Sequence, residues 1–385
     1  MFKTGITQLR LTNFRSYVYS DMTLDKSFVP VILTGRNGAG KTNILEAVSF
    51  LAPGRGLRSA RLNDVAHRTI HTTDDNVIQL PLKWSVSTEV WTQNGFSKIG
   101  TGTVDGSERR QIRINGQSIT KQSELGQIIS CLWLTPAQDR LFCGDPISRR
   151  RFLDRLVQAF DANHANRLSE YNTAFKQWSC LLREGCSDNG WLSGLEGQMV
   201  ATGVAIAASR LDIVERISAY LKTTDDAFFP RPEIILTGMI EQALLKKAAL
   251  TVEDEFSIHL KHSRRAYADG AGLIGPHTSD FKVIHATKST EASLCSTGEQ
   301  KALLLSILLA QMRAQAQEQG QCPLLLLDEV GAHLDAIRRD ALFEILKTLP
   351  TQVWMTGTDV AAFSYLKNQA QFFNVEDSTL RLQVA

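Results

Sequence analysis

The segment that most constrains the fold is a glycine-rich loop near the amino terminus. It reads GRNGAGKT, directly after the apolar run FVPVILTG and directly before NILEAVSFLA, whose apolar residues recur with helical spacing. A strand, a GxxxxGK[ST] loop and a helix in this order form a phosphate site, because backbone N–H groups point at the anion from a helix N-terminus. A glycine C-cap beside a surface lysine, the alternative, does not account for all eight positions. The predicted phosphate-binding residues are Gly35, Arg36, Asn37, Gly38, Ala39, Gly40, Lys41 and Thr42.

Lys41 is predicted to reach the β and γ phosphate oxygens, and Thr42 is predicted to bind Mg²⁺. A P-loop also needs a carboxylate at the end of a neighbouring strand. The four leucines of Leu324–Leu327 fit a strand buried on both faces, and Asp328 and Glu329 follow it directly. We expect Asp328 to support Mg²⁺ and Glu329 to polarise the attacking water. Solvated acids at a strand end are the alternative for this segment taken alone.

The separation of the two halves of this site along the chain predicts an insertion. Thr42 and Asp328 lie 286 residues apart, whereas one or two crossover units suffice to bring neighbouring strands together in a compact α/β domain. Between Pro146 and Pro230 the sequence lacks proline and is rich in Ala, Leu, Gln and Arg, which predicts several helices, with a break near 185–197. This helical segment is the expected insertion.

The fold class indicated by these patterns is α/β. From about 77 to 120, short alternating runs predict an antiparallel β meander, with turns at Asn94-Gly95, Asp105-Gly106 and Asn115-Gly116. Helix and strand alternate again after the helical segment. We therefore expect a P-loop ATPase lobe with a mixed sheet and a β meander, interrupted by an α-helical arm. The expected bounds are 1–145 for the first part of the lobe, 146–265 for the arm and 266–385 for the second part.

The composition excludes several other classes. The 42 Lys and Arg against 40 Asp and Glu give a net charge of +2, unlike a polycationic DNA-packing protein. The six cysteines form no CxxC pair or zinc spacing and indicate free thiols in a reducing compartment. No apolar run approaches the roughly 20 residues that a bilayer requires. We expect a cytoplasmic protein without a membrane partner.

A third element stands before the predicted helix from about Glu299 to Gln317. The loop Ser296–Gln300 reads STGEQ, and its N–H groups and serine hydroxyl can bind an anion at a helix start. A capped helix start without a ligand is the alternative. Beside the P-loop and the acidic strand end, this loop resembles the signature of ABC-type ATPases, in which the signature of one protomer covers the γ-phosphate held by the other. The resemblance implies a homodimer with two ATP molecules at its interface.

Longer motifs make the resemblance closer. In order, LRLTNFRSY, GRNGAGKT, RINGQSIT, LWLTPAQDRLFCGDPISRRRFLDR, IGPHTSDF, STGEQKALLLSILLAQ, LLLLDEVGAHLD and WMTGTD resemble the RecF family of bacterial DNA replication and repair proteins, from about residue 9 to 359. The resemblance implies an ABC-type, SMC-like ATPase head with a helical arm. It also implies slow, DNA-dependent ATP hydrolysis, ATP-driven dimerisation on single-strand gaps and junctions, and RecR- and RecO-type partners in loading recombinase.

The roles that the resemblance implies fall on residues already singled out. Lys41 and Glu329 are the expected catalytic residues, with ATP and Mg²⁺ as cofactors. Arg15 in NFRSY resembles an arginine that neutralises phosphate, and Asp335 in GAHLD resembles an aspartate at the dimer interface. The expected contacts of the signature in trans are Ser296, Thr297, Gly298, Glu299 and Gln300.

Three positions depart from these patterns or stay open. ABC-type heads usually carry a histidine after the strand that follows the acidic strand, where this chain reads Met355–Thr358. Gln138 is a candidate Mg²⁺ sensor, and a solvent-exposed helix start is the alternative. His277 lies in a loop bounded by glycine and proline. We place it near the nucleotide, with a structural role as the alternative.

The predicted DNA contacts follow the regional charge. Residues 1–68 carry ten Lys and Arg against four acids, so this part is +6 and the remainder is −4. Two basic groups are expected to bind phosphates without reading bases, with scattered surface arginines as the alternative. These groups are Arg55, Arg58, Arg61, Arg109, Arg110 and Arg113. A further cluster, Arg149–Arg151 with Arg155, is assigned either to partners or DNA or to a solvated helix face.

Two rival functions share part of this evidence. The nucleotide-binding subunit of an ABC transporter has the same P-loop and signature, but it needs a coupling surface for a membrane partner and has no use for so long a helical insertion. A scaffold in which ATP is purely structural has no need of the Glu329 carboxylate.

Overall fold

The computed structural model describes residues 3–26, 28–73, 76–81, 83–104, 109–185, 188–223, 228–332 and 334–383. The chain divides into two compact units, each built from separate segments of sequence. Unit 1 comprises Met1–Asp139, Asp226–Pro230 and Ser296–Ala385, and unit 2 comprises Arg140–Asp225 and Arg231–Cys295. Unit 2 therefore interrupts unit 1 in the sequence.

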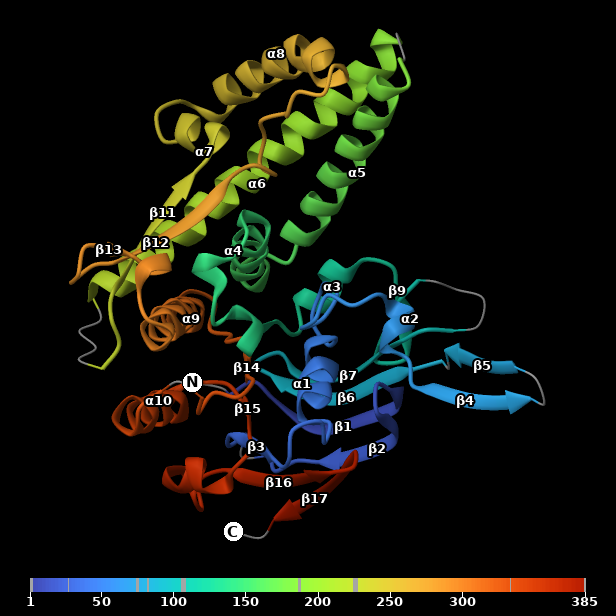
Figure 1. Ribbon diagram of the computed structural model, residues 1–385, viewed down its shortest axis with the longest axis vertical. Coiled ribbons are helices and arrows are strands. Elements are labelled where there is room, and N and C mark those ends of the chain that lie inside the picture. The colour runs from blue at the N-terminus through green and yellow to red at the C-terminus, as the bar shows by residue number, and fades with distance from the viewer. Residues whose placement is uncertain are drawn as a thin grey trace. The chain divides into compact units, whose positions relative to one another are not determined.

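The first of two six-stranded sheets in unit 1 is antiparallel, in the order β2-β1-β6-β7-β8-β9 (Figure 1). The β8–β9 hairpin turns through Asn115-Gly116, as the dipeptide predicts, whereas Gly95 already pairs with Thr92, so the β6–β7 turn is Gln93-Asn94. The predicted turn at Asp105-Gly106 lies outside the described residues. The strands are β1 Gly5–Phe14, β2 Tyr17–Thr23, β6 Ser85–Thr92, β7 Gly95–Gly102, β8 Gln111–Ile114 and β9 Gln117–Ile119.

The second sheet of unit 1 is parallel except at one edge, in the order β10-β14-β15-β3-β16-β17. Parallel strands present their carboxyl ends at one edge, where α/β sheets bind ligands. The strand before the phosphate loop, β3, and the acidic strand, β14, are separated only by β15. The strands are β3 Val31–Thr34, β10 Cys131–Leu134, β14 Leu324–Leu327, β15 Val353–Gly357, β16 Gln371–Glu376 and β17 Thr379–Gln383.

Helices and a small hairpin complete unit 1. The first core forms between α1 and the antiparallel sheet, where the rings of Phe14, Phe50 and Trp84 meet edge to face with centroids 5.2–5.9 Å apart. The helix α9 is buried on almost all sides from Gln300 to Ala316, so it is a core helix. The elements are α1 Lys41–Ser49, α2 Leu62–Val65, β4 Arg68–Thr73, β5 Asn76–Pro81, α3 Gln122–Gly126, η1 Pro136–Gln138, α9 Thr297–Gln319, α10 Ala336–Thr348 and η4 Val360–Leu366.

Unit 2 is mostly helical, but it also contains a three-stranded sheet. Because of this sheet, the arm ends later in the sequence than predicted. Strand β11 pairs antiparallel with β12, from Pro232 opposite His285 to Thr237 opposite Asp280. This backbone pairing keeps residues 266–295 in unit 2, so the expected return to the ATPase lobe at 266 is too early. The elements are η2 Leu141–Cys143, α4 Pro146–Phe160, α5 His164–Arg183, α6 Asn189–Thr223, β11 Pro232–Thr237, α7 Met239–Leu244, α8 Ala249–Ala268, β12 Asp280–His285, β13 Thr290–Glu291 and η3 Ala292–Leu294.

The long helices α5, α6 and α8 lie side by side within unit 2 and share one core (Figure 1). Trp178, Met199 and Phe256 are almost fully buried there. The predicted break between helices is narrower than expected, because α6 begins at Asn189 and continues through Gly197. In the described part of the chain, no helix is both long and apolar enough to cross a membrane.

Candidate nucleotide-binding site

The predicted phosphate loop joins β3 to α1 in a conformation that requires glycine at two close approaches. Gly35 and Gly40 have φ of 144° and 111°, where a side chain is strained. A Cβ on Gly35 would lie 2.2 Å from the carbonyl oxygen of Val375, and one on Gly40 would lie 2.8 Å from the hydroxyl of Tyr17. Helix α1 begins without a side-chain cap. Its first N–H groups therefore face the loop and suit an anion.

The ammonium of Lys41 lies inside this loop. Its Nζ donates to the carbonyl oxygens of Gly35 at 2.7 Å and Arg36 at 2.9 Å. Burial lowers the pKa of Lys41, while the nearby carboxylates of Glu329 and Asp328 act in the opposite direction. The loop thus holds a positive charge close to the acids that follow β14.

Thr42 joins the phosphate loop to the acidic strand. Its Oγ1 donates to the carboxylate of Asp328, 3.0 Å from each oxygen, across 286 residues of sequence. The Asp328 residue is only 7% exposed. A hydroxyl and a carboxylate side by side are the oxygen donors that Mg²⁺ prefers, so these two residues fit the ion that the sequence predicts.

The hydroxyl of Thr356, at the end of β15, connects the Asp328 carboxylate to the backbone of Glu329. It donates to Oδ1 of Asp328 at 2.7 Å and accepts from the backbone N–H of Glu329 at 2.8 Å. Thr356 is fully buried and belongs to the stretch where a histidine was expected in ABC-type heads. One threonine at a strand end carries no sequence pattern, so its role is visible only in the fold.

The predicted signature lies at the start of α9. Ser296 caps the helix: its Oγ accepts from the N–H of Glu299 at 3.4 Å, and the Glu299 carboxylate accepts from the Ser296 N–H at 3.0 Å. Ser296 and Thr297 are exposed, Gly298 and Glu299 are half-buried, and Gln300 is buried. The loop therefore presents its first residues on the surface of unit 1.

Asp335 has a similar place at the start of α10. Its carboxylate accepts from the N–H of Arg338 at 2.8 Å, and its side chain is 57% exposed. It caps the helix and stays accessible, as a residue of an interface between protomers must be before assembly.

Two predicted ligands have other partners. The Oε1 of Gln138, the atom that would face a magnesium ion, accepts from the N–H of Thr135 at 3.1 Å in a capping box. Arg15 makes a two-pronged ion pair with the buried carboxylate of Glu46, at 2.6 and 2.8 Å, and donates to the carbonyl of Asp64. Both contacts satisfy these side chains within unit 1, so the structure does not aim either at the phosphate loop.

The predicted DNA-contacting arginines divide into two kinds. Arg110 is a correction, because its guanidinium donates to the carbonyls of Phe50 and Gly54 and to the Thr101 hydroxyl, and burial lowers its pKa to about 10. Its remaining N–H groups donate to the carbonyl of Ala52, so this side chain has no donor left for DNA. Arg58 shares the Glu46 carboxylate at 2.9 Å but remains 42% exposed. The remaining members are exposed, namely Arg55, Arg61, Arg109 and Arg113.

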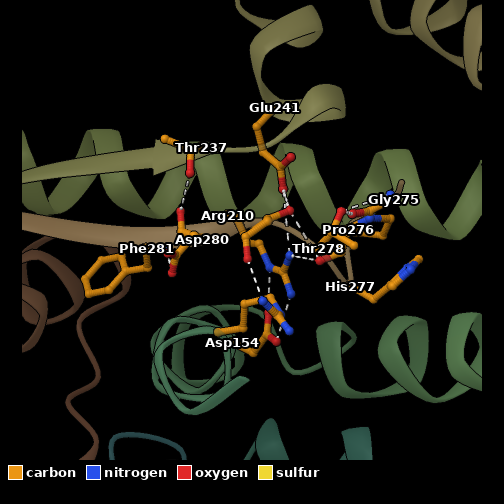
Figure 2. Close-up of polar contacts among 12 residues, drawn as sticks. Asp154, Arg210, Thr237, Glu241, Gly275, Pro276, His277, Thr278, Asp280 and Phe281 are labelled. Carbon is orange, nitrogen blue, oxygen red and sulfur yellow. Dashed lines mark hydrogen bonds and ion pairs between the residues drawn. The ribbon is translucent and has the colours of Figure 1, made fainter. Parts of the chain in front are cut away.

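The other motif residues, His277 and the arginine cluster, belong to unit 2, and Figure 2 shows His277 in the segment from Gly275 to Asp280. His277 stacks on Phe175 with centroids 4.5 Å apart, its Nδ1 accepts from the Tyr171 hydroxyl at 2.7 Å, and its Nε2–H donates to the carbonyl of Leu273 at 3.0 Å. Both ring nitrogens are therefore engaged, and burial lowers the pKa of His277. This geometry favours the structural alternative over a ligand of the nucleotide.

The arginine cluster at the start of α4 is also largely internal. Arg149 makes a two-pronged pair with Asp280 at 2.8 and 2.9 Å, and Arg150 donates to the Ser279 carbonyl at 2.8 Å. Burial lowers the pKa of Arg155 to about 9. These contacts join the PISRRRFLD and GPHTSD motifs to one another inside unit 2.

Comparison with known proteins agrees with this geometry. The family model described as the RecF/RecN/SMC N-terminal domain matches residues 5–380. The DNA replication and repair protein RecF of Agrobacterium fabrum is 43% identical over 377 residues, which cover 97% of each chain. The protein of the same description from Allorhizobium ampelinum is 42% identical over 384 residues, or 99% of each chain.

Solved structures show the same fold. The recombination mediator protein RecF-ATP of the RecFOR pathway superposes with a TM-score of 0.81 at 20% identity, covering 100% of this chain and 98% of that one. An Smc head bound to the C-winged helix domain of ScpA has a TM-score of 0.55 at 16% identity, covering 98% and 97%. The fold is thus that of an ABC-type, SMC-like ATPase head with an inserted helical unit, and the chain belongs to the RecF family of DNA replication and repair proteins.

Proposed function

We propose that this protein is an ATP-driven switch on DNA that acts in recombinational repair and replication restart. The observation that carries the proposal is the continuous polar chain from the phosphate loop to the acidic strand: Thr42 to Asp328, Asp328 to Thr356, and Thr356 to the Glu329 backbone. These contacts support a site in which the Glu329 carboxylate acts on a nucleophile near the phosphate loop, a group that a purely structural nucleotide site does not need.

Each residue of the site has a defined task in ATP hydrolysis. The loop Gly35–Thr42 holds the phosphates with backbone N–H groups, and Lys41 exchanges its loop carbonyls for the β and γ oxygens. Thr42 and Asp328 hold Mg²⁺, which neutralises phosphate charge when bound. Glu329 orients the attacking water and accepts its proton. Slow turnover suits a switch whose state must persist on DNA.

Dimerisation supplies the switch. The exposed signature residues of one protomer contact the ATP held by the other, and Asp335 lies at the dimer interface, so two ATP molecules bind the closed homodimer better than the open protomers. Hydrolysis removes that differential affinity and reopens the dimer. The exposed arginines of unit 1 bind phosphates of single- and double-stranded DNA at gaps and junctions. RecO- and RecR-type proteins in the cytoplasm are the proposed partners for loading recombinase.

Sedimentation with and without ATP tests the proposal. Lys41→Met should remain monomeric at saturating ATP, whereas Glu329→Gln should form a stable dimer and stall its release. Lys367→Met, which removes an exposed lysine of unit 1, is the matched control and should dimerise and dissociate like the wild type. A Glu329→Gln protein that stays monomeric with bound ATP would sink the model of ATP-driven closure.

The transporter alternative is not favoured. The relatives named above are DNA replication and repair proteins matched along almost their whole length. ATP-dependent protection of a junction between single- and double-stranded DNA, measured against each strand form alone, addresses the DNA part of the proposal directly. Equal protection with and without ATP would contradict it.

A further inference from the structure

The buried ammonium of Lys301 contacts the segment that carries the catalytic glutamate. Lys301 lies in the first turns of α9, directly after the signature residues, and its side chain is 1% exposed. Its Nζ donates to the carbonyl of Ala332 at 2.7 Å and to the carbonyl of Glu329 at 3.2 Å. A carboxylate oxygen of Asp139 lies 3.9 Å away.

This lysine is costly as a packing residue. Burying an ammonium costs several kcal/mol unless charges and hydrogen bonds compensate. Burial lowers the pKa of Lys301, and the carboxylates of Asp139, Glu329 and Asp328 oppose that effect. A methionine or leucine would fill the same volume without this cost. What the lysine adds is a pair of hydrogen bonds to backbone carbonyls.

The backbone at Glu329 needs such support. Its φ of 50° lies in the left-handed region, which is strained for a residue with a side chain. The peptide before its Cα is held by Thr356, which accepts from the N–H. The peptide after its Cα is held by Lys301, which donates to the C=O. The two contacts fix the direction in which the carboxylate leaves the backbone.

The same ammonium also closes the turn that follows. The N–H of Ala332 donates to the carbonyl of Glu329 at 3.1 Å, and Lys301 binds the carbonyls of both residues. Asp335, the N-cap of α10, follows three residues later. One side chain therefore ties the signature helix to the glutamate and to the segment that leads to the proposed dimer contact.

We propose that Lys301 is a positioning residue that couples the signature helix to Glu329. When the signature of a protomer engages the nucleotide of its partner, any shift of α9 moves the Glu329 peptide through Lys301. Assembly at one site thereby sets the glutamate of the other. The inference rests on the proposed function, in which Glu329 is the base.

Lys301→Met tests the coupling with three readouts. The Kd for ATP should stay within about twofold, while kcat should fall about 10- to 100-fold, because a small displacement of a catalytic group has an effect of this size. Amide hydrogen exchange at Ala332 should accelerate, since its turn loses a bound cation. Lys367→Met, the matched control, should change none of the three. Wild-type kcat, or a weakened Kd with unchanged kcat, overturns the inference.

A second variant and a reference variant keep these outcomes separate. Should Lys301→Met fail to fold, Lys301→Gln, which keeps an N–H donor, carries the same test and should lose less kcat. Glu329→Gln is the reference. If it is inactive while a folded Lys301 variant shows wild-type kcat and exchange, the coupling is wrong and the proposed function stands. If Glu329→Gln hydrolyses ATP normally, the proposed function fails, and exchange at Ala332 still decides whether Lys301 fixes the turn.

Discussion

Two buried polar networks, one in each unit, consist of similar side chains but differ in how their charges are paired. The Arg210 network of unit 2 centres on Asp154, whose carboxylate accepts from Arg210 at 2.8 and 2.9 Å (Figure 2). The same carboxylate contacts Nε2 of His164 at 2.9 Å. Arg210 also donates to the carbonyl of Pro276 at 2.6 Å, and Glu241 lies 3.7 Å from it. The nucleotide-site network of unit 1 consists of Lys41, Thr42, Asp328, Glu329 and Thr356.

The difference lies in how charge is matched. In the Arg210 network, Asp154 and Arg210 meet directly, and the cation keeps the pKa of Asp154 below its ordinary value. In the nucleotide-site network, Lys41 donates to carbonyls and Asp328 accepts from hydroxyls, so neither charge has its opposite as a hydrogen-bond partner. We call a network closed when its opposite charges hydrogen-bond to one another, and such a network stabilises the fold. A network whose charges lack an opposite partner is suited to a charged ligand.

The largest expected effect comes from removing a charge of the nucleotide-site network. Asp328→Asn keeps an oxygen for the hydroxyls of Thr42 and Thr356, so the fold should persist, but the proposed Mg²⁺ site loses its carboxylate. Charge stabilisation of several kcal/mol is at stake, which corresponds to a loss of about 100-fold or more in kcat. Phosphate release and thermal unfolding measure the two parts, with Asp254→Asn on the exposed face of α8 as the control. Near wild-type turnover of Asp328→Asn would mean that the nucleotide-site network, like the Arg210 network, does not bind a charged ligand.

The next effect comes from breaking the Arg210 network. Arg210→Met leaves Asp154 buried without its main partner, which should lower the free energy of unfolding by about 3–5 kcal/mol. Arg216→Met is the control, since its ion pair with Asp212 is exposed and should contribute about 1 kcal/mol or less. Denaturant unfolding followed by a probe in unit 2 makes the measurement. Equal losses in the two variants would show that burial of the network does not matter.

The sequence was sufficient for the parts of the site that depend on local pattern. The strand, loop and helix around Lys41 and the acidic end of β14 were confirmed, because glycine spacing and a run of leucines determine them over a few residues. The helix expected from Glu299 to Gln317 was likewise confirmed as α9. Insertion of a helical unit followed from one number, the separation of Thr42 from Asp328.

The remaining features depend on contacts between distant segments. Thr356 meets Asp328 because β15 pairs with β14, and Lys301 meets Glu329 through backbone carbonyls that no side-chain pattern records. Arg110 was predicted to bind DNA, yet its donors turn inward to carbonyls after α1. The end of the arm was misplaced because the pairing of β11 with β12 is not visible in helical composition.

A smaller effect separates two arginines of one strand region in unit 1. Arg110→Ala should lower the free energy of unfolding by about 1–3 kcal/mol, because the carbonyls of Phe50 and Gly54 lose their donor. Arg113→Ala, at an exposed position, should leave stability unchanged and reduce the salt dependence of DNA binding by about one unit. Denaturant unfolding and DNA-binding titrations are measured on both variants, and each variant serves as the control for the other. The reverse assignment would return Arg110 to the DNA contacts.

The smallest effect concerns Glu241, the member of the Arg210 network that is least well paired. The Ser279 hydroxyl donates to its Oε1 at 2.5 Å, but among the described residues no group hydrogen-bonds to its buried Oε2. Burial raises the pKa of Glu241 above its ordinary value of 4.5. Below that value the carboxyl is neutral in both folded and unfolded states, so pH has no effect through it.

As pH rises from 4.5 towards the raised pKa, the unfolded chain ionises this carboxyl while the folded protein keeps it protonated, so stability is lost relative to Glu241→Gln. Above the raised pKa both states are ionised, and the loss is complete. The difference in unfolding free energy between the two proteins should therefore grow above pH 4.5 and then level off. The growth should be steeper in an Arg210→Met background, where the opposing cation is gone, than with Arg210 present. A difference that stays flat with pH in the Arg210 protein would mean that the cation fully compensates Glu241, and the Arg210 network would then be closed at every member.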